Sequence, residues 1–280
     1  MLLNVGCGHK FHEDWVNIDM VSSHPAVIEY NILCGLPFPS NQFDVVYHSQ
    51  VLEHIPKEKS DSFLTECFRV LKPGGIIRVV LPDLENIVKE YQKYMNLCVT
   101  EKTDVAEANY DWILLEMYDQ SVRNAPGGLM AKYFAEPELS NEPYVLERSG
   151  YIGRALRKHY QNQSQMNVAR SGVKNTIEKI TRNLNYKKIR SRLLSAVLTS
   201  EERESIRLGK FRNGGEIHYW MYDRFSLSRL LLKTGFENPT QKTPFESEIP
   251  NWATYNLDVK DGQVFDPAAL FIEARKPADK

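Results

Sequence analysis

Two glycines and an acid near the start of the chain have the spacing of a ligand-binding turn. Gly6 and Gly8 follow the apolar run at residues 2–5, and glycine lets a backbone turn sharply and approach a bound molecule because it has no Cβ. Asp19 closes a second apolar run at residues 15–19. A carboxylate in that place can accept hydrogen bonds from both hydroxyls of a ribose, so the pattern predicts a nucleotide-type pocket.

Several side chains could exchange a proton with a substrate, because histidine and the carboxylates are the most common general bases. They are His48, His54, Asp83, His218 and Asp223. Asp83 follows an apolar run, at the strand end where open α/β sheets place their ligands. His218 begins the aromatic segment HYWMYDR. We predict catalytic roles for Asp83 and His218, with packing as the alternative for the aromatic segment and bracing of a turn as the alternative for His54.

The cysteines do not form a metal-binding or disulfide pattern. They stand about thirty residues apart without a CxxC or a Cys/His cluster, at Cys7, Cys34, Cys67 and Cys98. Such spacing predicts reduced thiols and neither a zinc site nor a disulfide framework. We therefore expect a site without a metal.

Alternating strand and helix patterns must position these residues. Strands are predicted at residues 2–5, 15–19, 26–30, 43–49, 76–82 and 269–276. Runs such as IIRVVLP are apolar throughout, which is typical of parallel strands buried on both faces. Apolar positions at helical spacing predict helices over 63–71 and 225–232, the second closed by Gly235. The predicted fold class is α/β, with a doubly wound, mostly parallel, Rossmann-like sheet and a large helical insertion.

The middle of the chain has helical periodicity and an excess of positive charge. We expect a core formed by residues 1–95 and 213–280, interrupted by a helical insert at 96–212 that acts as a lid and selects the substrate. Residues 147–212 hold 16 Lys and Arg against 5 Asp and Glu. An excess of one charge indicates the kind of partner that a segment can bind and does not indicate its fold. The amphipathic segment 173–198 leaves three alternatives open: a solvated face, a site for an acidic substrate or nucleic acid, or a helix on a membrane surface.

Four segments in the right order resemble the class I S-adenosylmethionine-dependent methyltransferases. They are LLNVGCG, NID, LPFPSNQFDVVYHSQVLEHI and RVLKPGGIIRVVLPD. The chain is most similar to the Methyltransf_11-like bacterial group, strongly over residues 1–85 and more loosely over 215–236 and the last strand. The resemblance implies a methyltransferase that uses S-adenosyl-L-methionine.

The resemblance also implies which residues surround that cofactor. Gly6 and Gly8, with Asn4 before them, would border the methionine moiety, Asp19 the ribose, Asn31 and Ile32 the adenine edge, and His48 and Ser49 the methionine end. Two positions depart from the family pattern. The usual opening acid is Asn4, and the usual third glycine is Lys10.

A nicotinamide-dependent oxidoreductase is the alternative enzyme for such a fold, and a non-catalytic S-adenosylmethionine-binding protein is the alternative without turnover. Only ten residues separate Gly8 from Asp19, and four of them, WVNI, belong to the second strand. A parallel crossover normally needs about a dozen residues or more. The link is therefore expected to be a tight loop, without the helix N-terminus that binds a dinucleotide pyrophosphate.

The methyl acceptor is the least determined part of the prediction. The resembling group serves saccharide and envelope assembly, which implies a small-molecule or saccharide hydroxyl, acidic or lipid-linked, as the acceptor. Nucleic acid is disfavoured, because LPDL (81–84) is not the Asn/Asp-Pro-Pro-aromatic motif of amino-methylating enzymes. No apolar run approaches about 18 residues, so we expect a cytoplasmic protein, with contact at the inner membrane surface through 173–198 as an open alternative.

Overall fold

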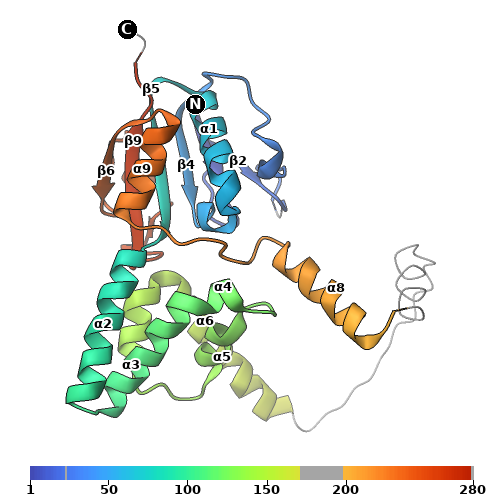
Figure 1. Ribbon diagram of the computed structural model, residues 1–280, viewed down its shortest axis with the longest axis vertical. Helices are drawn as coiled ribbons and strands as arrows, with labels where there is room; N and C mark the ends of the chain where they lie inside the picture. Colours follow the sequence, from blue (N-terminus) through green and yellow to red (C-terminus); the bar gives the residue numbers. More distant parts are fainter. Residues whose placement is uncertain (23, 171–197, 279–280) are drawn as a thin grey trace.

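One seven-stranded sheet, in the order β3-β2-β1-β4-β5-β9-β6, organises the chain (Figure 1). The computed structural model describes residues 1–22, 24–170 and 198–278. The strands are β1 (Leu2–Val5), β2 (Trp15–Asp19), β3 (Val27–Glu29), β4 (Phe43–Ser49), β5 (Leu71–Pro82), β6 (Glu237–Lys242) and β9 (Ala269–Arg275). Strands β1 to β5 run parallel to one another, whereas β9 is antiparallel to both β5 and β6. The predicted fold class is confirmed.

The sequence prediction located most of these strands and missed one. The predicted strands at 2–5, 15–19 and 43–49 have the observed bounds, and the others differ by a few residues at their ends. Strand β6 has the sequence ENPTQK and no buried residue. Because none of its side chains is buried, this edge strand lacks the apolar run that indicates a strand in a sequence.

Helices cover one face of the sheet and an irregular segment covers the other. The helices α1 (Ser60–Val70) and α9 (Arg224–Thr234) pack on the first face, where they form a hydrophobic core with β1, β4 and β5. Helix α9 ends at Gly235 in the left-handed conformation, with φ of 106°, as expected. The second face carries a cluster of aromatic residues, Trp15, Tyr47, Trp252 and Phe271. The segment that covers this face includes the short helix η5 (Trp252–Thr254). The small hairpin of β7 (Val259–Lys260) and β8 (Gln263–Val264) follows it in the sequence.

A second, helical layer lies beyond the carboxyl ends of the parallel strands (Figure 1). It comprises α2 (Leu84–Thr100), α3 (Asp104–Leu114), the π-helical turn η4 (Leu115–Asp119), α4 (Gln120–Val122), α5 (Gly128–Ala135) and α6 (Glu142–Arg170). The layer has its own core, which includes Ile87, Trp112 and Phe134. Helix α2 starts two residues after β5, so the expected boundary between residues 95 and 96 lies inside this helix.

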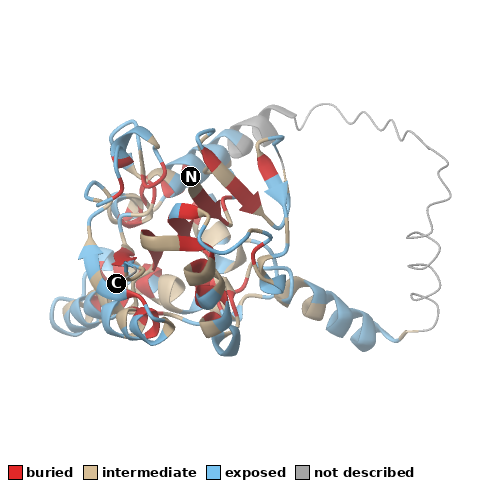
Figure 2. Ribbon diagram, turned by 90° about the horizontal axis from the view of Figure 1, so that it is seen from above, coloured by how far each residue is buried: buried red, intermediate tan, exposed pale blue. Residues whose placement is uncertain are grey.

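The basic part of the insert is only partly described. Helix α8 (Ser200–Arg212) has no buried residue and projects from the rest of the protein (Figure 2). Two arginines of the basic segment are instead buried and paired, Arg148 with Glu116 and Arg157 with Glu142. The predicted amphipathic segment at 173–198 lies almost entirely outside the described residues. Among the helices that the structure describes, none has the length and apolar character needed to cross a membrane.

Candidate functional site

The glycine turn and the acid meet at the carboxyl ends of β1 and β2. Gly6 and Gly8 both have positive φ, of 65° and 52°. The backbone N–H of Gly8 donates to Asp19 Oδ2 at 2.8 Å, and the N–H of Val21 donates to Oδ1 at 3.2 Å. A Cβ at Gly8 would meet no atom within 4 Å, whereas one at Gly6 would lie 2.4 Å from a methyl of Val51. The turn is therefore closed on the side of Val51 and open beside the half-buried Asp19 carboxylate.

The link after the turn is short, as the sequence predicts. Residues 6–14 contain no helix, and β2 follows directly. This confirms the expected tight loop between β1 and β2 and leaves no crossover helix whose N-terminus could hold a pyrophosphate. The strand order reverses between β1 and β4, which is the place where open α/β sheets bind their ligands.

The two departures from the family pattern, Asn4 and Lys10, contact the same loop. Asn4 is buried, and its side-chain amide donates to the carbonyl of Lys10 at 2.9 Å and to Asn17 Oδ1 at 3.2 Å. The Lys10 ammonium donates to Ser49 Oγ at 3.1 Å and lies 5.1 Å from the centroid of the Phe265 ring. Asn4 thus holds the loop, and Lys10 brings a cation to the end of β4. Burial lowers the pKa of Lys10, opposed by nearby carboxylates.

The remaining predicted cofactor residues occupy different environments. Asn31 is exposed and caps the short helix η1 (Ile32–Cys34), where its Oδ1 accepts from the N–H of Leu33. Ile32 is partly buried and packs against the main hydrophobic core. The His48 ring is fully buried, 5.3 Å from the centroid of Phe63, and burial lowers its pKa to about 3. The structure therefore brings Gly6, Gly8, Asp19, Lys10 and Ser49 to the strand ends and puts His48 in the core.

A cavity of about 380 Å³ lies between the sheet and the helical layer. The sheet side includes Gln50 and Asp83, which follow β4 and β5 directly. The helical side is mostly apolar, with Trp112, Met130 and Phe134 among its residues. A concave, mainly apolar pocket with a few polar groups at a domain boundary is the usual form of a small-molecule site.

Both predicted catalytic residues line this cavity. Asp83 caps helix α2 by accepting from the N–H of Glu85 at 3.0 Å, and burial raises its pKa. His218 is buried, its backbone N–H donates to the Gln120 carbonyl at 3.1 Å, and its Nε2 lies 2.9 Å from the Gln120 amide nitrogen. Burial lowers the pKa of His218 well below its usual value. Burial thus favours the neutral imidazole of His218, and Asp83 has a structural role in addition to its place in the cavity.

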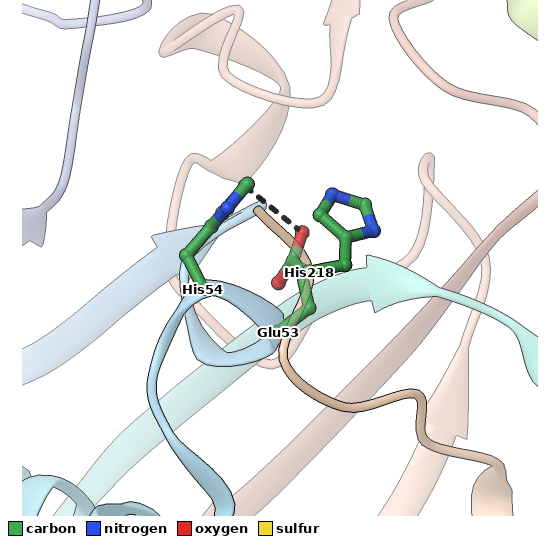
Figure 3. Close-up of side chains that lie close together, drawn as sticks. All are labelled: Glu53, His54 and His218. Atoms are coloured by element: carbon green, nitrogen blue, oxygen red, sulfur yellow. Dashed lines mark ion pairs between the residues drawn. The ribbon is translucent and has the colours of Figure 1, made fainter. Parts of the chain in front are cut away.

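The structure also reveals an acid that the sequence analysis did not single out. Glu53 is 1% exposed, and neither of its carboxylate oxygens has a hydrogen-bond partner among the described residues. Burial raises its pKa to about 8. Its Oε1 lies 4.0 Å from His54 Nε2 (Figure 3). The available signal was its position before His54 in VLEHI, at the carboxyl end of a strand.

The fold and the strand-end turn together define a doubly wound α/β protein with a Rossmann-like ligand site. Comparison with known proteins specifies the family. Residues 3–79 match the family described as methyltransferase domain. They are a class I S-adenosylmethionine-dependent methyltransferase domain, and S-adenosylmethionine is the cofactor that this domain implies.

Individual relatives cover limited parts of the chain. A probable S-adenosylmethionine-dependent methyltransferase of Mycolicibacterium smegmatis is 43% identical over 56 residues, 20% of this chain and 21% of that protein. Phosphoethanolamine N-methyltransferase of Plasmodium falciparum is 26% identical over 91 residues, 29% of this chain and 34% of that protein. The crystal structure of an S-adenosylmethionine-dependent methyltransferase from Archaeoglobus fulgidus is 12% identical, with a TM-score of 0.38 over 98% of this chain and 85% of that one. The chain thus matches about a fifth to a third of the length of its curated relatives.

The residues at the strand ends fit the cofactor at its ribose end. Asp19 is half-buried, its two oxygens are oriented by backbone N–H groups, and the space beside Gly8 is open. Each carboxylate oxygen retains acceptor capacity for a hydroxyl, because it has a second lone pair. Asp19 would hold the ribose, and Gly6 and Gly8, with Ser49, would border the methionine moiety.

Proposed function

We propose that this protein transfers a methyl group from S-adenosylmethionine to a hydroxyl of a small-molecule or saccharide acceptor bound in the cavity. The observation that carries the proposal is the position of the cavity. Gln50, which lines it, directly follows Ser49, and the Lys10 ammonium contacts Ser49 at 3.1 Å. A ligand on the glycine turn and a ligand in the cavity would therefore meet at the end of β4.

The reaction needs alignment more than it needs activation by the protein. The cofactor supplies a methyl group on a sulfonium, from which it is displaced in line: the acceptor oxygen forms the new bond to carbon, and the carbon–sulfur electron pair stays on sulfur. The protein has to hold the acceptor and exclude water. His218, neutral and at the cavity wall, can accept the hydroxyl proton, and Asp83 can position the acceptor.

The cavity also supports an acidic acceptor. The Arg123 side chain is 9% exposed and lines the cavity, and its Nε has no hydrogen-bond partner among the described residues. Its Nη1 lies 3.4 Å from Glu216 Oε1. A guanidinium with a free donor is suited to a carboxylate or phosphate. Since Arg123 and most other lining residues belong to the helical insert, we propose that the insert selects the acceptor while the core binds the cofactor.

The substitution Asp19→Ala tests cofactor binding. Hydrogen bonds to a charged group contribute about 1.5 to 3 kcal/mol each, so we expect Asp19→Ala to weaken the binding of S-adenosylmethionine at least tenfold. Isothermal titration calorimetry with S-adenosylmethionine and its demethylated product measures this change, and a titration with NAD examines the oxidoreductase alternative.

A matched control separates binding from loop damage. Asp14 is an acid in the same loop whose side chain lies 3.7 Å from His12 and is 74% exposed, so Asp14→Ala should leave the affinity unchanged. Asp19→Asn keeps one acceptor oxygen and should have an intermediate effect. An affinity unchanged by Asp19→Ala would show that this acid does not contact the ribose.

A further inference from the structure

Glu53, His54 and His218 bring three potential metal ligands together at the wall of the cavity. One carboxylate oxygen and one nitrogen from each imidazole all lie within 4.8 Å of one another. Glu53 and His54 belong to the turn after β4, and His218 reaches them from the segment before α9 (Figure 3). The centroids of the two imidazole rings are 4.6 Å apart, and the ring planes are nearly perpendicular. His218 thus shares one small volume with Glu53 and His54, although it lies far from them in the sequence.

The surroundings orient these groups as ligands. His54 Nδ1 lies 3.1 Å from the carbonyl of Ile217, which fixes the proton on that nitrogen and leaves the lone pair on Nε2. Metal-binding histidines commonly donate their second ring N–H to a backbone carbonyl in this way. At His218 the Gln120 amide nitrogen stands 2.9 Å from Nε2. A turn of that carboxamide brings its oxygen to Nε2 instead, and the lone pair of the ring then lies on Nδ1.

The buried carboxylate is the second observation that points to a cation. Both oxygens of Glu53 are without a hydrogen-bond partner among the described residues, and the residue is 1% exposed. An ionised carboxylate in such a place is unfavourable unless it is paired or coordinates a metal. The contact with His54 Nε2, at 4.0 Å, is too long for a hydrogen bond. A bound cation would satisfy this carboxylate.

We propose that Glu53, His54 and His218 bind a divalent transition-metal ion, with Zn²⁺ as the best fit. Two imidazoles and one carboxylate form the donor set of catalytic zinc sites, which keep one position open. Ligand atoms about 2.1 Å from a tetrahedral ion stand roughly 3.4 Å apart. The present separations of up to 4.8 Å need side-chain shifts on the order of 1 Å to close. Imidazole ligands favour Zn²⁺ over Mg²⁺ or Ca²⁺, which prefer oxygen.

The site adjoins the place proposed for the acceptor. His54 and His218 both line the cavity, so an ion held by them stands at its wall, where an acceptor oxygen can complete the coordination. In the ion-free protein this lone pair of His218 can accept the proton of the acceptor hydroxyl. In the protein with a bound ion, the same lone pair coordinates the ion. Ion binding itself does not depend on methyl transfer, so the two proposals can fail separately.

Metal titration of the full chain tests the proposal. After treatment with a chelator, we expect calorimetry to show one Zn²⁺ bound per chain, and Co²⁺ to give the visible absorption of a four-coordinate ion. Glu53→Gln, His54→Asn and His218→Asn should each weaken Zn²⁺ binding at least tenfold and remove the Co²⁺ absorption. Mg²⁺ at the same concentration should not compete.

A surface histidine provides the matched control. His24 is exposed in the loop before β3, so His24→Gln should bind Zn²⁺ as the unaltered protein does. Circular dichroism serves as the test of folding for every variant, because it does not depend on the binding of S-adenosylmethionine. Absence of Zn²⁺ binding, or binding that none of the three substitutions weakens, would overturn the proposal. Neither result would affect the proposed use of S-adenosylmethionine.

Discussion

Replacing Arg78 with methionine is expected to lower the free energy of unfolding by about 3 to 5 kcal/mol, because it leaves buried carboxylates without their cation. Arg78 is fully buried in β5, and its guanidinium lies 2.7 Å from both Asp258 Oδ2 and Glu273 Oε1. It also donates to the carbonyls of Glu246 and Thr243 at 3.0 Å each. Arg78 thus joins the sheet to the segment that covers its second face. Urea denaturation followed by circular dichroism measures the change.

An exposed arginine provides the comparison. Arg207 pairs with Glu204 on α8, and the two side chains are 51% and 54% exposed. Ion pairs of this kind contribute about 0 to 1 kcal/mol, so Arg207→Met should change stability little. The triple variant Arg78→Met, Asp258→Asn, Glu273→Gln removes the charges together and should recover part of the loss. A single Arg78→Met variant as stable as the unaltered protein would show that the cluster does not hold the covering segment.

The loss in Arg78→Met should depend on pH. Burial already raises the pKa of Asp258, against the opposing effects of Arg78 and of the Tyr47 hydroxyl. Removal of Arg78 raises this pKa further above the value in the unfolded chain. A carboxyl of this type stabilises the fold at low pH and loses that contribution as pH rises through its folded pKa. The deficit in unfolding free energy should therefore be smaller at about pH 5 than at about pH 8.

Local patterns in the sequence were sufficient for the parallel part of the sheet and for the glycine turn beside Asp19. Buried strands such as β4 are apolar over several consecutive residues, and Gly6, Gly8 and Asp19 belong to segments that adjoin in the sequence. The tight link between β1 and β2 could be predicted from its length alone, because a crossover helix needs more residues. Such features depend on neighbouring residues, which a single sequence displays.

Features built by distant segments could not be predicted in the same way. In the sequence, Arg78 is a single charged residue within an apolar strand. Only the fold shows that Asp258 and Glu273 lie beside it. The cluster of Glu53, His54 and His218 has no short metal-binding motif, because its third member arrives from beyond the helical insert. The expectation of a site without metal rested on the spacing of cysteines, which says nothing about ligands that the fold assembles.

The second large effect on stability is expected at the junction where the helical layer meets the segment before β9. Helix α6 consists of two helical parts joined at Gly150, which has φ of 56° and ψ of −140°. A Cβ there would lie 2.4 Å from Pro267 Cδ and 2.5 Å from the carbonyl oxygen of Val264. Residues beside this contact, Ser149 and Phe265, line the cavity. The close approach of two backbones thus shapes the wall where the acceptor is proposed to bind.

Gly150→Ala is therefore expected to destabilise the protein by about 3 kcal/mol, since a strained backbone costs about 1 to 3 kcal/mol and overpacking a similar amount. Gly209→Ala is the matched control. Gly209 lies inside α8, and a Cβ there would meet no atom within 4 Å, so alanine should stabilise that helix by about 0.5 to 1 kcal/mol. Thermal unfolding of both variants gives shifts of opposite sign. Equal shifts would mean that the backbone at Val264 and Pro267 moves away to accommodate the added methyl group. The tight contact at Gly150 would then not determine the shape of the acceptor site.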